Sequence, residues 1–172
     1  MSDMHPHETE DLWSWACNSL DNTVNKLSFA LDMKMKDSKL VIDIHDVDFP
    51  IYDKTDEKSY ETGDPLNAVP ITKLQDEIAF PLDKMTFSHG DDTVMSFYKQ
   101  YGFSSWDVIQ NILAFERQVR PKTESFGGID YDHVYFEGIC ATQDKKLKIF
   151  GVLRFATPRP PPPFCVSLIE PK

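Results

Sequence analysis

Residues 27–44 read LSFALDMKMKDSKLVIDI, and their hydrophobic side chains recur at every second position. A period of two is typical of a β-strand that turns one face to the core. The first alternating series ends at residue 36, and the second begins at residue 40 after the polar residues 37–39. The stretch therefore predicts a long antiparallel hairpin whose first strand covers residues 27–36.

Other parts of the chain carry the three-and-four spacing of amphipathic helices, at about residues 10–22, 91–101 and 104–120. The last of these begins with Ser104 and Asp107, which resemble a capping box. A second alternating hairpin is predicted from Val134 to Phe155, and Phe164, Val166 and Leu168 predict a last strand at a sheet edge. The sequence thus predicts an α+β fold. A mostly antiparallel sheet, built from two β-hairpins plus a C-terminal strand, packs against two central helices and a short N-terminal helix.

Two segments interrupt these patterns. Residues 48–90 contain four prolines and many acids, and they predict an extended acidic segment pinned to the surface by short apolar pieces. Residues 158–163 are rich in proline, which donates no backbone hydrogen bond, so a polyproline connector is expected there. A chain of 172 residues suits a single domain over 1–172.

Composition limits the environment and the partners. The formal net charge is -10, which repels nucleic-acid phosphates and anionic lipid headgroups. The chain holds no apolar run long enough to span a membrane and no basic leader followed by an apolar stretch. Three widely spaced cysteines do not form a disulfide framework. We therefore expect a cytoplasmic protein that binds neither nucleic acid nor membrane.

The strongest concentration of charge lies in residues 43–64, which hold eight acidic residues against two lysines. Complementary charge speeds association and selects partners, so this stretch predicts contact with a protein that has a basic surface. The proline run could dock into an aromatic-lined groove; a stiff connector is the alternative interpretation. The residues expected to bind a partner are Asp46, Asp48, Asp53, Asp56, Glu57, Glu61, Arg159, Pro160, Pro161, Pro162, Pro163 and Phe164.

Catalytic motifs are not recognisable in the sequence, and no catalytic residue, metal site or cofactor is predicted. The acidic residues 53–64 have the length of a calcium-binding loop, but Lys58 stands where that loop requires glycine. A ligand pocket between sheet and helices would be invisible at this level, and His89, His133 and Glu137 are the candidates to line one.

The sequence therefore predicts a non-enzymatic protein-interaction module, either a subunit of a larger assembly or an acidic inhibitor of a basic partner. The alternative is a small enzyme or ligand-binding protein that uses the pocket. An exposed edge strand would also allow pairing between copies of the chain, because its backbone groups are unpaired.

Overall fold

The computed structural model describes residues 6–31, 33–36, 39–42, 50–58, 65–89, 93–119, 125–126, 129–130 and 133–154. Within them the chain is α+β, as the sequence predicts. The helices are α1 (Pro6–Asn22), α3 (Ile71–Asp76) and α4 (Ser105–Val119), with the 3-10 turns η1 (Val24–Lys26) and η2 (Pro65–Asn67).

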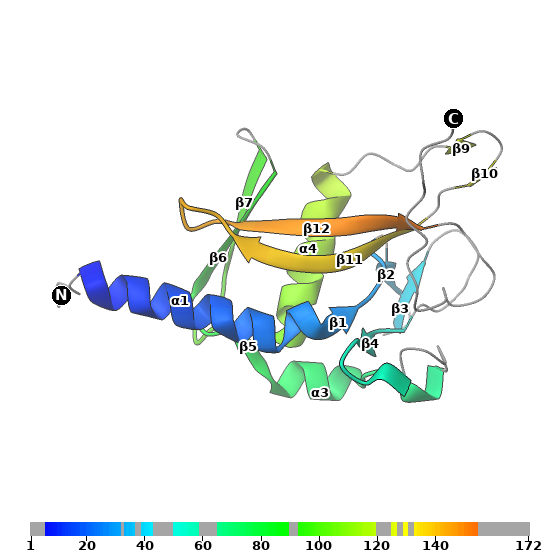
Figure 1. Cartoon of the computed structure of the whole chain (residues 1–172), viewed down its shortest axis with the longest axis horizontal. Helices are drawn as coiled ribbons and strands as arrows, with labels where there is room; N and C mark the ends of the chain where they lie inside the picture. The colour runs from blue at the N-terminus through cyan, green and yellow to red at the C-terminus, as the bar shows by residue number, and fades with distance from the viewer. Residues whose placement is uncertain are drawn as a thin grey trace.

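The described part of the central sheet has four strands in the order β11-β12-β6-β7. They are β6 (Lys84–His89), β7 (Thr93–Tyr98), β11 (His133–Ala141) and β12 (Leu147–Arg154). Two antiparallel hairpins, β6–β7 and β11–β12, join where β12 runs parallel to β6, with Leu147 opposite Phe87. Figure 1 shows α4 crossing this sheet, with α1 and α3 below the β11–β12 hairpin. The hairpin predicted from Val134 onwards is confirmed.

Short antiparallel strand pairs surround the central sheet. They are β1 (Leu27–Ser28) with β4 (Tyr52–Asp53), β2 (Met33–Lys36) with β3 (Lys39–Ile42), β5 (Ile78–Phe80) with β8 (Phe103–Ser104), and β9 (Ser125–Phe126) with β10 (Ile129–Asp130).

The first predicted hairpin is confirmed in β2 and β3, which pair from Met33 with Ile42 to Lys36 with Lys39. The single strand expected over residues 27–36 is wrong. Leu27 to Leu31 are all buried, rather than alternately buried and exposed. They are buried on every side because β1 pairs with β4 while Ala30 forms a bridge to Tyr135 of β11. The chain therefore leaves one pairing partner for another before β2 begins.

The helix predicted over residues 91–101 is wrong, because residues 93–98 form strand β7. Only one of the two predicted central helices, α4, is a helix where the sequence placed it. Residues 93–98 read TVMSFY, a β-branched and aromatic composition that favours strands. Their register with β6 supplies the hydrogen bonds that decide the conformation.

The extended surface segment expected over residues 48–90 is also wrong for residues 65–89. This part contains α3, β5 and β6, and β6 is an inner strand of the central sheet. Ala79, Phe80, Met85 and Phe87, which looked like surface anchors, are fully buried core residues. The predicted last strand and the polyproline connector lie outside the described residues.

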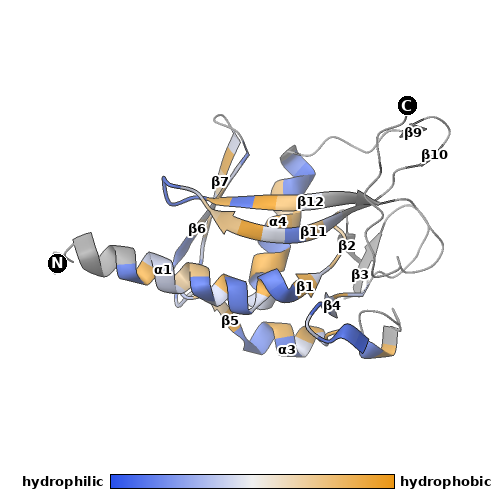
Figure 2. Ribbon diagram, in the orientation of Figure 1, coloured by the Kyte–Doolittle hydropathy of each residue, from blue (hydrophilic) through white to orange (hydrophobic). Residues whose placement is uncertain are grey.

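Aromatic side chains fill the space between the sheet and the helices. The Phe87 ring of β6 lies 5.6 Å from Phe115 of α4 and 5.9 Å from Phe97 of β7, centroid to centroid. Trp13 of α1 meets Phe80 edge-on at 6.0 Å. Figure 2 shows the matching pattern, with hydrophobic residues on α4 and on the strands, and hydrophilic residues along much of α1.

Candidate interaction surface

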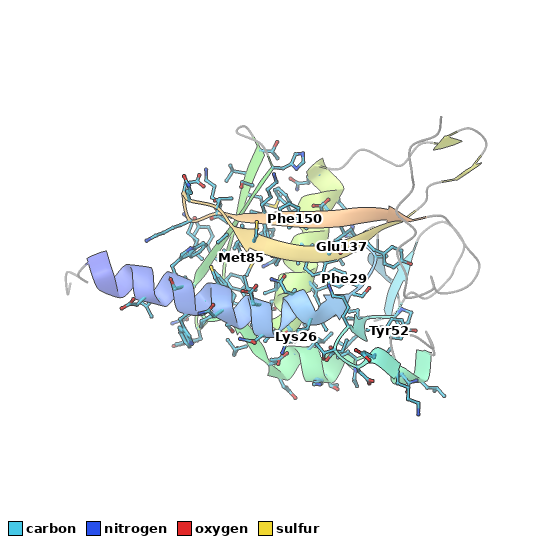
Figure 3. All side chains as sticks on the ribbon, viewed as in Figure 1. Lys26, Phe29, Tyr52, Met85, Glu137 and Phe150 are labelled. Atoms are coloured by element: carbon cyan, nitrogen blue, oxygen red, sulfur yellow. The ribbon has the colours of Figure 1, made fainter. Side chains whose placement is uncertain are left out.

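The two faces of the central sheet differ in what covers them. Side chains alternate between faces along a strand, and Met85, Phe87, Leu147 and Ile149 are buried on the inner face. The residues between and beside them point to the opposite face, which we call the outer face. Figure 3 shows Phe29, which stacks on the inner side against Phe136, and Phe150 on opposite sides of the β11–β12 hairpin.

Hydrophobic side chains are exposed on the outer face. The exposed fractions are 72% for Tyr98, 46% for Val94 and 44% for Phe150. Lysines lie over two of these rings: the Lys84 ammonium is 5.6 Å from the centroid of Tyr98, and the Lys148 ammonium is 5.6 Å from that of Phe150. Lys84 and Tyr98 are direct cross-strand neighbours. Val94 and Tyr98 lie on β7, the last strand in the sheet order, whereas Phe150 lies on β12, two strands away from β7.

Strand β7 lies at one edge of the sheet, and β6 is its neighbour on one side. The Lys99 N–H donates to the Asp83 carbonyl at 2.9 Å, which continues the β6–β7 ladder by one residue pair. In an antiparallel ladder, hydrogen-bonded and non-hydrogen-bonded pairs alternate. The odd-numbered residues of β7 therefore bond to β6, and the N–H and C=O groups of Val94, Ser96 and Tyr98 point away from it. No described strand pairs with this side of β7.

Edge strands in proteins commonly carry a lysine, a proline or a bulge that blocks pairing with another chain. Within Thr93–Tyr98, strand β7 has none of these devices, and the first lysine, Lys99, comes after its last residue. Its sequence TVMSFY is uncharged, and its register with β6 is continuous from Tyr98 to Thr93. Among the described residues, the outward side of the strand is therefore open to an additional strand from Thr93 to Tyr98.

The opposite edge, β11, is protected. Its register shifts between Phe136 and Gly138, which marks a bulge. The Phe136 N–H donates to the Phe29 carbonyl at 2.9 Å, and the Lys54 ammonium donates to the Glu137 carbonyl at 3.3 Å. Two residues further along, the Asn25 side chain is hydrogen-bonded to both the N–H and the C=O of Ile139. The β11 edge is thus occupied by the chain itself, whereas no strand in the described part of the chain occupies the β7 edge.

Of the acidic residues expected to bind a partner, the structure describes Asp53, Asp56 and Glu57, at and after β4. The Asp53 carboxylate accepts hydrogen bonds from the Thr55 N–H at 2.8 Å and the Thr55 hydroxyl at 2.6 Å, so it stabilises the turn. Asp56 and Glu57 are exposed. Asp46, Asp48, Glu61 and all of Arg159 to Phe164 lie outside the described residues.

The residues expected to line a pocket lie on different strands. His89 ends β6 and Glu137 lies at the bulge of β11, with β12 between the two strands, and both side chains are exposed. His133 begins β11, opposite Arg154. Within the described ranges, no three His, Cys, Asp or Glu side chains are grouped to hold a metal ion. None of the described helices is long and apolar enough to cross a membrane.

Comparison with protein-family models, with curated proteins and with solved structures finds no match for this chain. The candidate surface is therefore assigned from the geometry of this chain alone. Sequence reasoning missed it because Val94, Phe97 and Tyr98 also fit a helical spacing. The composition of residues 93–98 was the signal for a strand, and an alternating pattern with Met95 and Phe97 inside would have identified the exposed side chains.

Proposed function

We propose that this protein is a non-enzymatic protein-interaction module that accepts an extended strand of a partner along β7. The observation that carries the proposal is the open edge formed by Val94, Ser96 and Tyr98, whose backbone groups point away from β6. Adding a strand to an exposed sheet edge is a recurrent mode of peptide recognition: backbone hydrogen bonds give affinity, and alternate side chains give specificity.

The neighbouring side chains favour a partner strand that carries apolar side chains on both of its faces. On the outer face, such side chains would pack on Val94 and Tyr98, which are exposed, and no described strand lies beside them across the open edge. On the inner face they would extend the layer of Met95 and Phe97, which are partly buried against the core. Hydrophobic burial would add to the backbone hydrogen bonds on both faces.

A partner that is a different protein is expected to carry a basic surface as well. The net charge of -10 attracts such a partner at long range, and Asp56 and Glu57 are exposed beyond β4. In Figure 1, β4 and β7 lie on opposite sides of α4, so a single small strand would not touch both. The acidic region therefore acts on the encounter rate in this proposal, whereas β7 forms the stable contact.

The variant Ser96→Pro tests the proposal. Proline removes one outward N–H and its ring blocks the approach of a strand, while the bonds from β7 to β6 come from the odd-numbered residues. The full-length protein serves as bait in a pull-down, and each captured protein is purified and tested for direct binding. We expect direct binding to be lost with Ser96→Pro, and hydrogen exchange of the Val94, Ser96 and Tyr98 amides to slow in the complex with the parent protein.

Phe150→Ser is the matched control, because Phe150 is on the outer face but on the inner strand β12. It should retain binding. Circular dichroism and thermal unfolding must show that both variants are folded. Undiminished binding of every partner to folded Ser96→Pro, with no protection of β7 amides, would refute strand addition at this edge.

A further inference from the structure

The geometry points to a second copy of this chain as the occupant of the β7 edge, and we propose that the protein forms a twofold dimer centred on Ser96. This inference depends on the proposed function, since it names the partner of the same surface. Two copies related by a twofold axis meet through the same patch, so the strand must be complementary to itself in antiparallel orientation.

The register follows from the direction of the backbone groups. Only Val94, Ser96 and Tyr98 offer N–H and C=O groups to the open side, so even-numbered residues must face even-numbered residues of the second copy. Placing Ser96 opposite Ser96 of the second copy puts Val94 opposite Tyr98 and Tyr98 opposite Val94. Every outward N–H and C=O of these three residues then has a partner. A centre at residue 95 or 97 would pair only two of these three residues with one another.

The same register matches the side chains. Val94, exposed by 46%, lies beside Tyr98 of the second copy, exposed by 72%. A β-branched residue opposite an aromatic residue is a favourable cross-strand pair. On the inner face Met95 lies opposite Phe97, so the partly buried side chains of the two copies extend one core. Ser96, which is hydrogen-bonded to Thr86 at 2.8 Å, fills the centre without a bulky clash.

Because of its charge, the dimer should respond to salt in the opposite way to a complex with a basic partner. No charged side chain occurs in Thr93–Tyr98, so like charges within the two strands do not oppose each other. Two copies that each carry a net charge of -10 nevertheless repel at long range, and salt screens that repulsion. Added salt should therefore strengthen the dimer, whereas it should weaken binding to a basic partner.

Sedimentation velocity of the full chain over a series of protein concentrations, at low and high salt, measures the association. We expect the parent to pass from monomer to dimer as concentration rises, and to do so at lower concentration in high salt. Ser96→Pro and Val94→Lys should both remain monomeric, and Phe150→Ser should behave as the parent. Val94→Lys is the second edge variant in case Ser96→Pro does not fold. The Val94 side chain is exposed, so lysine at this position should leave the monomer folded.

Oxidative cross-linking tests the register. In the Cys140→Ser background, Ser96→Cys should form a disulfide-linked dimer, because paired Cα atoms at such a position are about 5.5 Å apart and a disulfide spans about 4.4–6.8 Å. The matched control is Thr93→Cys. In this register the two copies of residue 93 are six positions apart along the strand, or about 20 Å, so this variant should not cross-link.

A parent protein that stays monomeric throughout, or a dimer that persists in both folded edge variants, overturns the inference. If the parent is monomeric while Ser96→Pro still loses direct binding to another protein, the inference of a dimer is wrong and the proposed function stands. If the parent is monomeric and Ser96→Pro binds every captured protein unchanged, both fail.

Discussion

Asn25 and Ile139 exchange two hydrogen bonds across a sequence separation of 114 residues. The Asn25 amide donates to the Ile139 carbonyl at 3.0 Å, and the Ile139 N–H donates to the Asn25 side-chain oxygen at 2.7 Å. The side chain thus supplies the pattern that a neighbouring strand would offer, at the bulged part of β11. A single residue that follows α1 thereby closes the part of the β11 edge at Ile139, next to the parts bonded to Phe29 and Lys54.

Asn25→Ala should destabilise the protein by about 1–3 kcal/mol, because it leaves two backbone groups of a nearly buried residue unpaired. The midpoint of urea unfolding, followed by circular dichroism, measures the change. Asn22→Ala is the matched control, since Asn22 donates only to Asn18 at an exposed position on α1. The control should change stability by less than about 0.5 kcal/mol. Equal effects from the two variants would contradict a sealing role for Asn25.

Gly102→Ala should be more damaging than its size suggests. Gly102 has a φ of +87°, and an added Cβ would lie 2.7 Å from the Phe80 carbonyl oxygen and 2.9 Å from the Pro81 Cα. Both contacts are backbone atoms that cannot move aside, so we expect a loss of roughly 2–4 kcal/mol. Tyr101→Gly is the neighbouring control: Tyr101 has a φ of +70° and an exposed side chain, and glycine should not destabilise it. The midpoint of thermal unfolding is measured for both variants. A lower midpoint for Gly102→Ala alone identifies backbone strain as the cause, whereas a lower midpoint for Tyr101→Gly would indicate a loss of side-chain contacts.

The sequence predicts the α+β class and the hairpins at β2–β3 and β11–β12, because their alternation is local and their turns are short. It does not predict β7, whose apolar residues fit both a helical and a strand period. Only the neighbouring strand β6 decides between them. The same holds for Leu27 to Leu31, where burial on every side depends on β4 and β11, which are distant in sequence.

The candidate surface shows the same division between local and distant information. The exposed position of Val94 and Tyr98 follows from the order of the strands, which no local pattern contains. The acidic stretch was visible in composition alone, yet the Asp53 carboxylate accepts hydrogen bonds from its own turn. Composition identified where charge is concentrated, and the topology identified where backbone groups are unpaired.

Asp107 should make stability depend on acidic pH. Burial alone would raise its pKa, but hydrogen bonds from Lys99 and from the Ser104 hydroxyl and N–H outweigh burial and lower the pKa below the usual 3.8. A carboxylate with a lowered pKa in the folded state contributes stability above its unfolded pKa, and this stability is lost as pH falls through the folded pKa. Urea unfolding from about pH 6 down to about pH 3 measures this loss, and Asp107→Asn should make it smaller.

The confirmed capping box gives this prediction a second variant. The Asp107 N–H donates to the Ser104 hydroxyl at 3.1 Å, so Ser104→Ala removes the cap of α4 and one bond to the carboxylate. It should cost about 1 kcal/mol near neutral pH and also reduce the acid dependence, though less than Asp107→Asn does. An unchanged pH profile in Asp107→Asn would show that other groups cause the acid sensitivity.

The two described cysteines should differ in reactivity. Burial, with a smaller contribution from the nearby Asp21 carboxylate, raises the pKa of the Cys17 thiol above 9.0, whereas Cys140 is exposed on β11. The thiolate is the reactive form, so iodoacetamide at neutral pH should label Cys140 severalfold faster than Cys17. Mass spectrometry of peptides from a time course measures the two rates separately, and labelling in urea, where both thiols are solvated, should bring the rates together. Equal rates in the folded protein would contradict this difference, because they would mean that the partial burial of Cys17 on α1 does not protect its thiol.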